Sequence, residues 1–95
     1  DIEKITQTAL ESLSSRVYVS VDLDVLDPSI MAAVGTPEPG GMTWDTLTTL
    51  LKTVGNNREI VGFDVSELSP DEGPEACAFT AAKLVYKLIA YATMH

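Results

Sequence analysis

The sequence predicts a parallel α/β fold. Apolar residues recur at helical spacing in three segments, and the two segments between them show the alternation and β-branched residues of strands. The order helix, strand, helix, strand, helix is that of crossovers in a parallel sheet. Two parallel strands leave an open edge on either side, and the 95-residue chain begins at Asp1 rather than Met. We therefore expect one part of a larger α/β domain; a short chain that completes its sheet by oligomerising is the alternative.

The first half of the chain is predicted to hold one helix, one strand and a long loop. The helix spans residues 2–13 and is amphipathic, because its apolar residues lie three or four positions apart: Ile2, Ile5, Ala9 and Leu13. In residues 16–23 valines alternate with Tyr18 and Ser20, which is typical of a strand. Residues 27–41 contain three prolines and three glycines, so we expect no regular element there.

The second half is predicted to hold a helix, a strand and a last helix. Thr43 is placed to cap a helix that Gly55-Asn56-Asn57 should stop. The apolar residues of this helix share one face: Trp44, Leu47, Leu50, Leu51 and Val54. Residues 59–68 form the second strand, and Ser69-Pro70 ends it. The last helix, about residues 74–93, is apolar except along Lys83 and Lys87, so we expect it to be buried on several sides.

Charge and residue counts exclude several classes of protein. The chain has 14 acidic and 6 basic residues and a net charge of -8, so phosphate backbones and anionic lipid should repel it. No apolar run reaches the roughly 18 residues of a membrane span. A single Cys77, expected to be buried, and a single His95 cannot assemble a zinc site or a Ser-His-Asp triad within this chain. We expect a cytoplasmic protein that binds neither nucleic acid nor membrane and uses carboxylate chemistry.

Acidic residues cluster where the first strand is expected to end, in the run Asp22-Leu23-Asp24-Val25-Leu26-Asp27-Pro28. Ligands of parallel α/β sheets bind at the carboxyl ends of the strands. Side chains two positions apart on a strand point to the same face, so Asp22 and Asp24 should project together. Their mutual repulsion would be relieved by a divalent cation, and oxygen ligands favour Mg, Mn or Ca.

The same spacing fits other interpretations. Asp27-Pro28 is a common turn opener, so Asp27 is equally consistent with a turn cap that has Asp24 solvated beside it. An EF-hand is excluded, because Leu26 and Asp27 occupy its fifth and sixth positions. A phosphatase of the haloacid dehalogenase type also ends a strand in Asp-x-Asp, but it needs a downstream Lys and an acidic pair that the chain does not clearly provide. On spacing alone, a metal site and a structural turn remain open.

Longer runs resemble the ureohydrolase family of arginases and agmatinases. The run from Ser20 to Gly41 is similar to the third signature of that family, and Phe63-Asp-Val-Ser-Glu-Leu-Ser-Pro70 resembles its next strand. Thr80-Ala-Ala-Lys-Leu resembles its closing helix. The resemblance covers nearly the whole chain. It implies that residues 1–95 are the C-terminal portion of a single ureohydrolase domain, a fragment of the three-layer, parallel-sheet, arginase-like fold in the order α-β-α-β-α.

The resemblance also implies a site and a reaction. Ureohydrolases hold a binuclear manganese centre, in which Asp22 and Asp24 would be metal ligands and Asp22 would bridge the two ions. In this family a metal-activated hydroxide attacks the guanidinium carbon, and urea and an amine are released. Glu67 would bind the substrate by pairing with its guanidinium group, and Asp64 is given no catalytic role. The partners we expect are a small cationic guanidino substrate and further copies of the chain in a homo-oligomer.

Agmatine, hydrolysed to putrescine and urea, is the substrate that we expect, because Glu38-Pro39 and residues 79–87 look agmatinase-like. Arginase, guanidinobutyrase and formimidoylglutamase are alternatives, since the chain departs from the usual pattern at Ala32, Ser66 and Leu68. The other ligands of the family, a His and an Asp-x-His-x-Asp cluster, and its proton-shuttling His have no counterpart here. We therefore expect this segment alone to be inactive and to bind Mn weakly. A non-catalytic α/β module whose apolar last helix mediates assembly is the alternative from another class.

Overall fold

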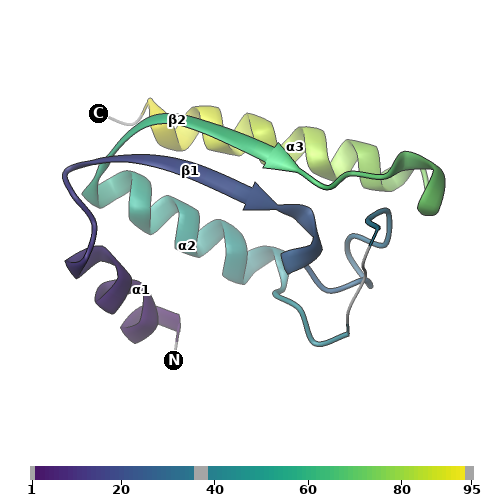
Figure 1. Cartoon of the computed structure of the whole chain (residues 1–95), viewed down its shortest axis with the longest axis horizontal. Coiled ribbons are helices and arrows are strands. Elements are labelled where there is room, and N and C mark those ends of the chain that lie inside the picture. The colour runs from purple at the N-terminus through teal and green to yellow at the C-terminus, as the bar shows by residue number, and fades with distance from the viewer. Residues whose placement is uncertain (1, 36–38, 94–95) are drawn as a thin grey trace.

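The computed structural model describes residues 2–35 and 39–93, which fold into three helices, two strands and two short 3-10 helices (Figure 1). In chain order these are α1 (Ile2–Glu11), β1 (Arg16–Asp22), η1 (Leu23–Val25), α2 (Trp44–Asn57), β2 (Glu59–Ser66), η2 (Pro70–Glu72) and α3 (Ala76–Ala92). The long elements follow the order α-β-α-β-α, as predicted. No helix in the described ranges is long and apolar enough to cross a membrane.

β1 and β2 pair as a parallel sheet, and their arrowheads point the same way in Figure 1. The register runs without interruption from Tyr18, opposite Gly62, to Asp22, opposite Ser66. It is irregular nearer the start of the strands, where Val61 is an extra residue that forms a bulge. This register places the ends of both strands side by side at one edge of the sheet.

One face of the sheet packs against α2 and α3. Val17 and Val21 of β1 join one apolar core with Leu47 of α2 and with Leu84 and Leu88 of α3. The segment after β1 belongs to the same core, and five of its residues are at most 1% exposed: Leu23, Leu26, Met31, Ala33 and Val34. Burial of apolar surface is the main force that holds such a fold together. The described stretch 23–34 is therefore part of the core, although it has little regular structure beyond η1.

The first helix differs from its prediction in length and in orientation. α1 ends at Glu11, two residues earlier than expected. Thr6 and Leu10 form its buried face, whereas Ile5 is 63% exposed and Ala9 is also exposed. The predicted apolar stripe was therefore wrong for these two residues. The main packing partner of α1 in the described structure is α2, and the face turned toward it is not the most apolar one.

The second helix begins and ends as predicted. The Thr43 hydroxyl accepts a hydrogen bond from the backbone N–H three residues on, at 3.1 Å. The predicted stop in the run Gly55-Asn56-Asn57 is confirmed, because α2 ends at Asn57 and the Arg58 amide closes its last turn. Glycine costs about 1 kcal/mol in a helix interior relative to alanine. Gly55 is buried in the last turn of α2.

The third helix buries a single face in the described structure. That face carries Cys77, as predicted, together with Ala81, Leu84, Leu88 and Tyr91. Three large side chains on α3 are exposed: Phe79 at 72%, Tyr86 at 74% and Ile89 at 51%. The prediction that this helix is buried on several sides was therefore wrong for the described part of the chain, where its main packing partners among the helices and strands are α2 and β2.

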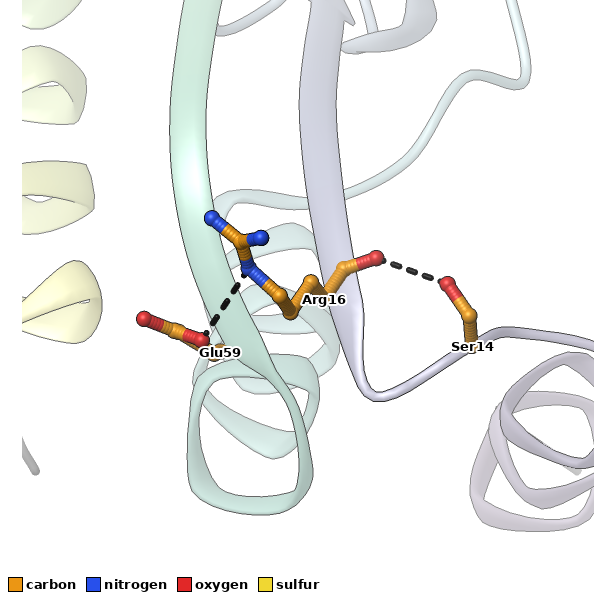
Figure 2. Close-up of polar contacts among 3 residues, drawn as sticks. All are labelled: Ser14, Arg16 and Glu59. Carbon is orange, nitrogen blue, oxygen red and sulfur yellow. Dashed lines mark hydrogen bonds and ion pairs between the residues drawn. The ribbon is translucent and has the colours of Figure 1, made fainter.

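The amino ends of the two strands are joined by an exposed ion pair. Nε of Arg16 lies 3.4 Å from Oε2 of Glu59, its register partner in β2 (Figure 2). The hydroxyl of Ser14 donates to the Arg16 carbonyl at 2.8 Å. Both charged side chains are more than half exposed, so the pair contributes little to stability. The predicted site residues lie toward the opposite ends of the strands.

Candidate metal and substrate site

The carboxyl ends of β1 and β2 bring the predicted site residues to one edge of the sheet. Asp22 is the last residue of β1 and is paired with Ser66, the last residue of β2. Glu67 follows Ser66 directly, and Asp24 follows Asp22 by two residues. Figure 1 shows this edge beside the long loop that leads to α2. The parallel pairing thus gathers acidic side chains from two segments that are far apart in the chain.

Asp22 and Asp24 are neighbours, although not for the reason that the sequence suggested. β1 ends at Asp22, one residue earlier than predicted, and Asp24 lies in the 3-10 turn η1. Asp22 caps that turn, because its Oδ1 accepts the Asp24 amide at 3.2 Å. The carboxyl groups are brought together by this turn and not by alternation along a strand.

The electrostatics of this pair favour a cation. Partial loss of water raises the pKa of Asp22, and a hydrogen bond with the Asp24 side chain and the charge of Asp24 raise it further, while the Asp24 amide lowers it. A raised carboxyl pKa means that the negative charge is incompletely compensated. Two adjacent carboxylates offer oxygen ligands of the kind that hard divalent cations take. The two donors therefore fit a hard divalent cation, manganese among them.

Within residues 2–35 and 39–93, Asp22 and Asp24 are two candidate ligands without a third beside them. Among the residues that the structure describes, no group of three or more His, Cys, Asp or Glu side chains is arranged to hold an ion. Asp22 and Asp24 are hydrogen-bonded to each other, whereas the Asp27 carboxylate accepts a hydrogen bond from the Gly40 amide in the adjacent loop. A complete metal centre built on this pair needs ligands from outside the described residues.

Glu67 stands at the end of β2 with an unusual backbone. The strand ends at Ser66, two residues earlier than predicted, because Glu67 has a φ of 71° and breaks the extended conformation. Positive φ occurs in only a few per cent of residues other than glycine. The next residue, Leu68, pairs with Val34 of the long loop in an isolated antiparallel bridge. The side chain of Glu67 is exposed and so is accessible to a ligand.

Asp27 organises the loop beside the site. Its Oδ2 accepts hydrogen bonds from both the amide and the hydroxyl of Ser29, and its Oδ1 accepts the Gly40 amide at 2.9 Å. The Ser29 hydroxyl contributes most to lowering the pKa of Asp27, followed by the Ser29 and Gly40 amides. The alternative prediction of an Asx-type turn at Asp27 is thus confirmed.

The two ends of the loop are held in close contact. The Asp27 amide donates to the Met42 carbonyl at 3.0 Å, and the Met42 amide donates to the Val25 carbonyl at 2.8 Å. A Cβ on Gly41 would lie 2.6 Å from the Asp27 nitrogen, so glycine is required by close backbone approach. Glu38, used above to favour agmatine, lies outside the described residues.

A polar network on the open face of the sheet was not predicted. Oδ1 of Asp64 accepts the Ser20 hydroxyl at 2.9 Å, and Oδ2 accepts the Tyr18 hydroxyl at 3.0 Å. The Tyr18 ring lies over Gly62, where a Cβ would be 3.0 Å from it. The alternation of Tyr18, Ser20 and Asp22 along β1 was the available signal of a polar face. Ser20 and Asp64 therefore share the face of the sheet that leads to Asp22.

Comparison with known proteins places the chain in a family. Residues 1–90 match the arginase family model. The N(1)-aminopropylagmatine ureohydrolase from one strain of Thermus thermophilus is 50% identical over 84% of this chain and 27% of its own length. The agmatinase of Pyrococcus horikoshii is 38% identical over 84% of this chain and 28% of its own length. The chain belongs to the arginase family.

Solved structures agree with this assignment. Proclavaminate amidino hydrolase from Streptomyces clavuligerus superposes with a TM-score of 0.87 at 33% identity, over 96% of this chain and 31% of that protein. The predicted arginase-like α/β fold is confirmed. The chain spans less than a third of the length of each of these three relatives. It therefore corresponds to a part of the fold that they share.

Proposed function

We propose that this chain forms part of a manganese-dependent ureohydrolase that hydrolyses a small cationic guanidino compound. Asp22 and Asp24 are the proposed metal ligands, and Glu67 is the proposed substrate-binding residue. The observation that carries the proposal is the register of the parallel strands, which sets Asp22 opposite Ser66 and so brings Glu67 to the same sheet edge. Membership of the arginase family supports it.

The two aspartates would hold the metal by their charge and oxygen atoms. When bound, manganese supplies Lewis acidity, which makes a hydroxide nucleophile available near neutral pH. The chain contributes the turn that fixes the carboxylates, since the Asp24 amide is bonded to Oδ1 of Asp22. This bond orients the Asp22 carboxylate before a cation arrives.

Glu67 would recognise the guanidinium group. A planar cation with several N–H donors is best held by charge-assisted and potentially bidentate hydrogen bonds to a carboxylate. The Glu67 side chain is exposed at the strand end, where it can accept such donors. The site as a whole is acidic, which favours a cationic ligand and its steering toward this edge.

Agmatine is the proposed substrate, and its N(1)-aminopropyl derivative is the first alternative. The residues that favour agmatine are those of the motif described above, and a 38% identical relative is an agmatinase. A 50% identical relative is named N(1)-aminopropylagmatine ureohydrolase, which supports the alternative. Both compounds carry a guanidinium at one end and an amine beyond it, so Glu67 could accept hydrogen bonds from the guanidinium of either.

Metal titration and urea release test the proposal directly. The full-length protein is titrated calorimetrically with Mn²⁺ and then assayed for urea from agmatine, N(1)-aminopropylagmatine and arginine. We expect Asp22→Asn and Asp24→Asn each to weaken Mn²⁺ binding by about tenfold or more. Asp45→Asn, an exposed change in the first turn of α2, is the matched control. Isotherms that do not differ among these variants would sink the metal assignment.

The substrate role of Glu67 has its own test. Hydrogen bonds to charged groups contribute about 1.5–3 kcal/mol, so Glu67→Gln should raise KM for the guanidino substrate by about 10- to 100-fold. Glu72→Gln, in the exposed turn η2, is the matched control. The expected Mn²⁺ affinity of Glu67→Gln is that of the parent protein. A KM equal to that of the control would remove Glu67 from the binding site.

A further inference from the structure

The left-handed backbone at Glu67 is maintained by contacts on both sides of it. On the preceding side, Ser66 is held in the sheet opposite Asp22. On the following side, Leu68 pairs with Val34, and the Ser69 amide donates to the Ala33 carbonyl at 2.7 Å. A costly conformation persists where the surroundings over-determine it. Here the surroundings are β1 and one stretch of the long loop.

That stretch, residues 31–34, is rigidly embedded. Met31 and Ala33 are 0% exposed and Val34 is 1% exposed. Gly73, beyond η2, lies against Ala33 so closely that a Cβ on it would be 2.7 Å from the Ala33 nitrogen and 2.8 Å from its Cα. Gly73 has a φ of -160°, an extended value that any residue adopts, so its small size is required only by this contact.

We propose that residues 31–34 are a positioning element for the Glu67 carboxylate, held in place by the contact of Gly73 with Ala33. The inference rests on the proposed function and deepens it. The same loop begins at η1, which carries Asp24, so one continuous segment links the metal pair to the substrate carboxylate. Displacing this segment should misplace the guanidinium without removing any ligand.

The features of Glu67 itself distinguish positioning from simple packing. Its side chain is exposed, so its carboxylate adds nothing to the core. Glycine would occupy a positive φ at no steric cost, yet a long charged residue stands there. The buried residues are instead Val34 and Ala33, which hold the two residues that follow Glu67. A turn built in this way fixes the direction in which the Glu67 side chain leaves the backbone.

The test is a double-mutant cycle in the full-length, Mn²⁺-loaded protein. Gly73→Ala is compared with Gly35→Ala, an exposed loop glycine whose Cβ would meet nothing within 4 Å. We expect Gly73→Ala to raise KM for agmatine by about tenfold or more, with unchanged Mn²⁺ content, and Gly35→Ala to leave KM as it was. In the Glu67→Gln background, Gly73→Ala should give no further rise in KM, because the carboxylate it misplaces is already lost.

Hydrogen exchange supplies a readout that does not depend on activity. The Ser69 amide should exchange faster in Gly73→Ala than in Gly35→Ala, because its bond to the Ala33 carbonyl is disturbed. If Gly73→Ala does not fold, Val34→Ala is used with Val17→Ala, a buried change at the far end of β1, as its control. The same rise in KM is then expected for Val34→Ala and not for Val17→Ala.

The outcomes separate this inference from the function on which it rests. A parent protein that releases no urea from any of the guanidino compounds overturns the proposed function, and the inference falls with it. A parent protein that does release urea, with KM equal in Gly73→Ala and Gly35→Ala, overturns the inference alone. An equal rise in KM in the presence and absence of Glu67→Gln also overturns it, because it shows general disruption.

Discussion

The backbone amide of Gly40 donates a hydrogen bond of 2.9 Å to Oδ1 of Asp27, 13 residues earlier in the chain. The other oxygen of the same carboxylate accepts the Ser29 amide at 3.0 Å, so one side chain holds both ends of the loop. Asp27→Asn turns one acceptor into a donor. We expect a lower melting temperature and faster hydrogen exchange at the Gly40 amide than in Asp45→Asn, an exposed change on α2. Equal exchange in the two variants would contradict this.

The hydrogen bonds of Asp27 also give the stability a pH dependence. They hold the pKa of Asp27 below its ordinary value of 3.8, with the Ser29 hydroxyl as the largest cause. A carboxyl whose folded pKa is lowered stabilises the fold above its ordinary pKa, and this contribution is lost as pH falls through the folded value. The stability difference between the parent and Asp27→Asn, from denaturant melts, should therefore shrink between about pH 5 and pH 2. A difference that stays constant would rule out this origin.

Arg58 links the first helix to the rest of the fold by a hydrogen bond. Its Nη2 donates at 2.6 Å to the Leu10 carbonyl in the last turn of α1, and the same carbonyl accepts the Leu13 amide at 3.1 Å. Arg58→Met should lower the free energy of unfolding by about 1.5–3 kcal/mol and expose α1 to proteolysis. Arg16→Met removes only the exposed pair with Glu59 and should cost less than about 1 kcal/mol. Equal losses in urea melts of the two variants would deny Arg58 this role.

Two aliphatic residues of α3 differ in burial and should differ in their contribution to the free energy of unfolding. Leu84 is 0% exposed in the core, and Ile89 on the same helix is 51% exposed. Leu84→Ala should cost about 2–5 kcal/mol, because it removes buried methyl groups and leaves a cavity. Ile89→Ala should change the unfolding free energy by less than about 0.5 kcal/mol. Denaturant melts measure both, and a loss at Ile89 close to that at Leu84 would reveal a burial that the described structure does not contain.

The element order was predictable from the sequence because the local spacing of apolar residues predicts each helix and strand. Valine alternation in β1 and the cap at Thr43 are signals carried by a few consecutive residues, and both predictions were confirmed. Element ends depend on longer contacts. β2 ends at Ser66 because Glu67 has a positive φ, and the chain then pairs with the long loop through Leu68 and Val34. This long-range contact leaves no local trace in the sequence.

The candidate site was predictable to the same degree. Parallel strand order places Asp22 and Glu67 at one edge of the sheet, which the sequence could predict from topology alone. The turn that brings Asp24 to Asp22 and the left-handed backbone of Glu67 could not be predicted, since both depend on local geometry that spacing does not fix. The roles of these residues toward metal and substrate stay predictions.

Tyr18 is expected to report on the polar face of the sheet. Its hydrogen bond to Asp64 is the largest cause that raises the Tyr18 pKa above 10.0, followed by loss of water and the Asp64 charge. A raised pKa in a phenol means that the bond stabilises the fold below the ordinary pKa and is lost as pH rises through the folded value. Phenolate absorbance should therefore show one tyrosine titrating at lower pH in Asp64→Asn than in the parent. Tyr18→Phe should abolish that difference and Tyr86→Phe should keep it; a difference that survives Tyr18→Phe would assign it to another tyrosine.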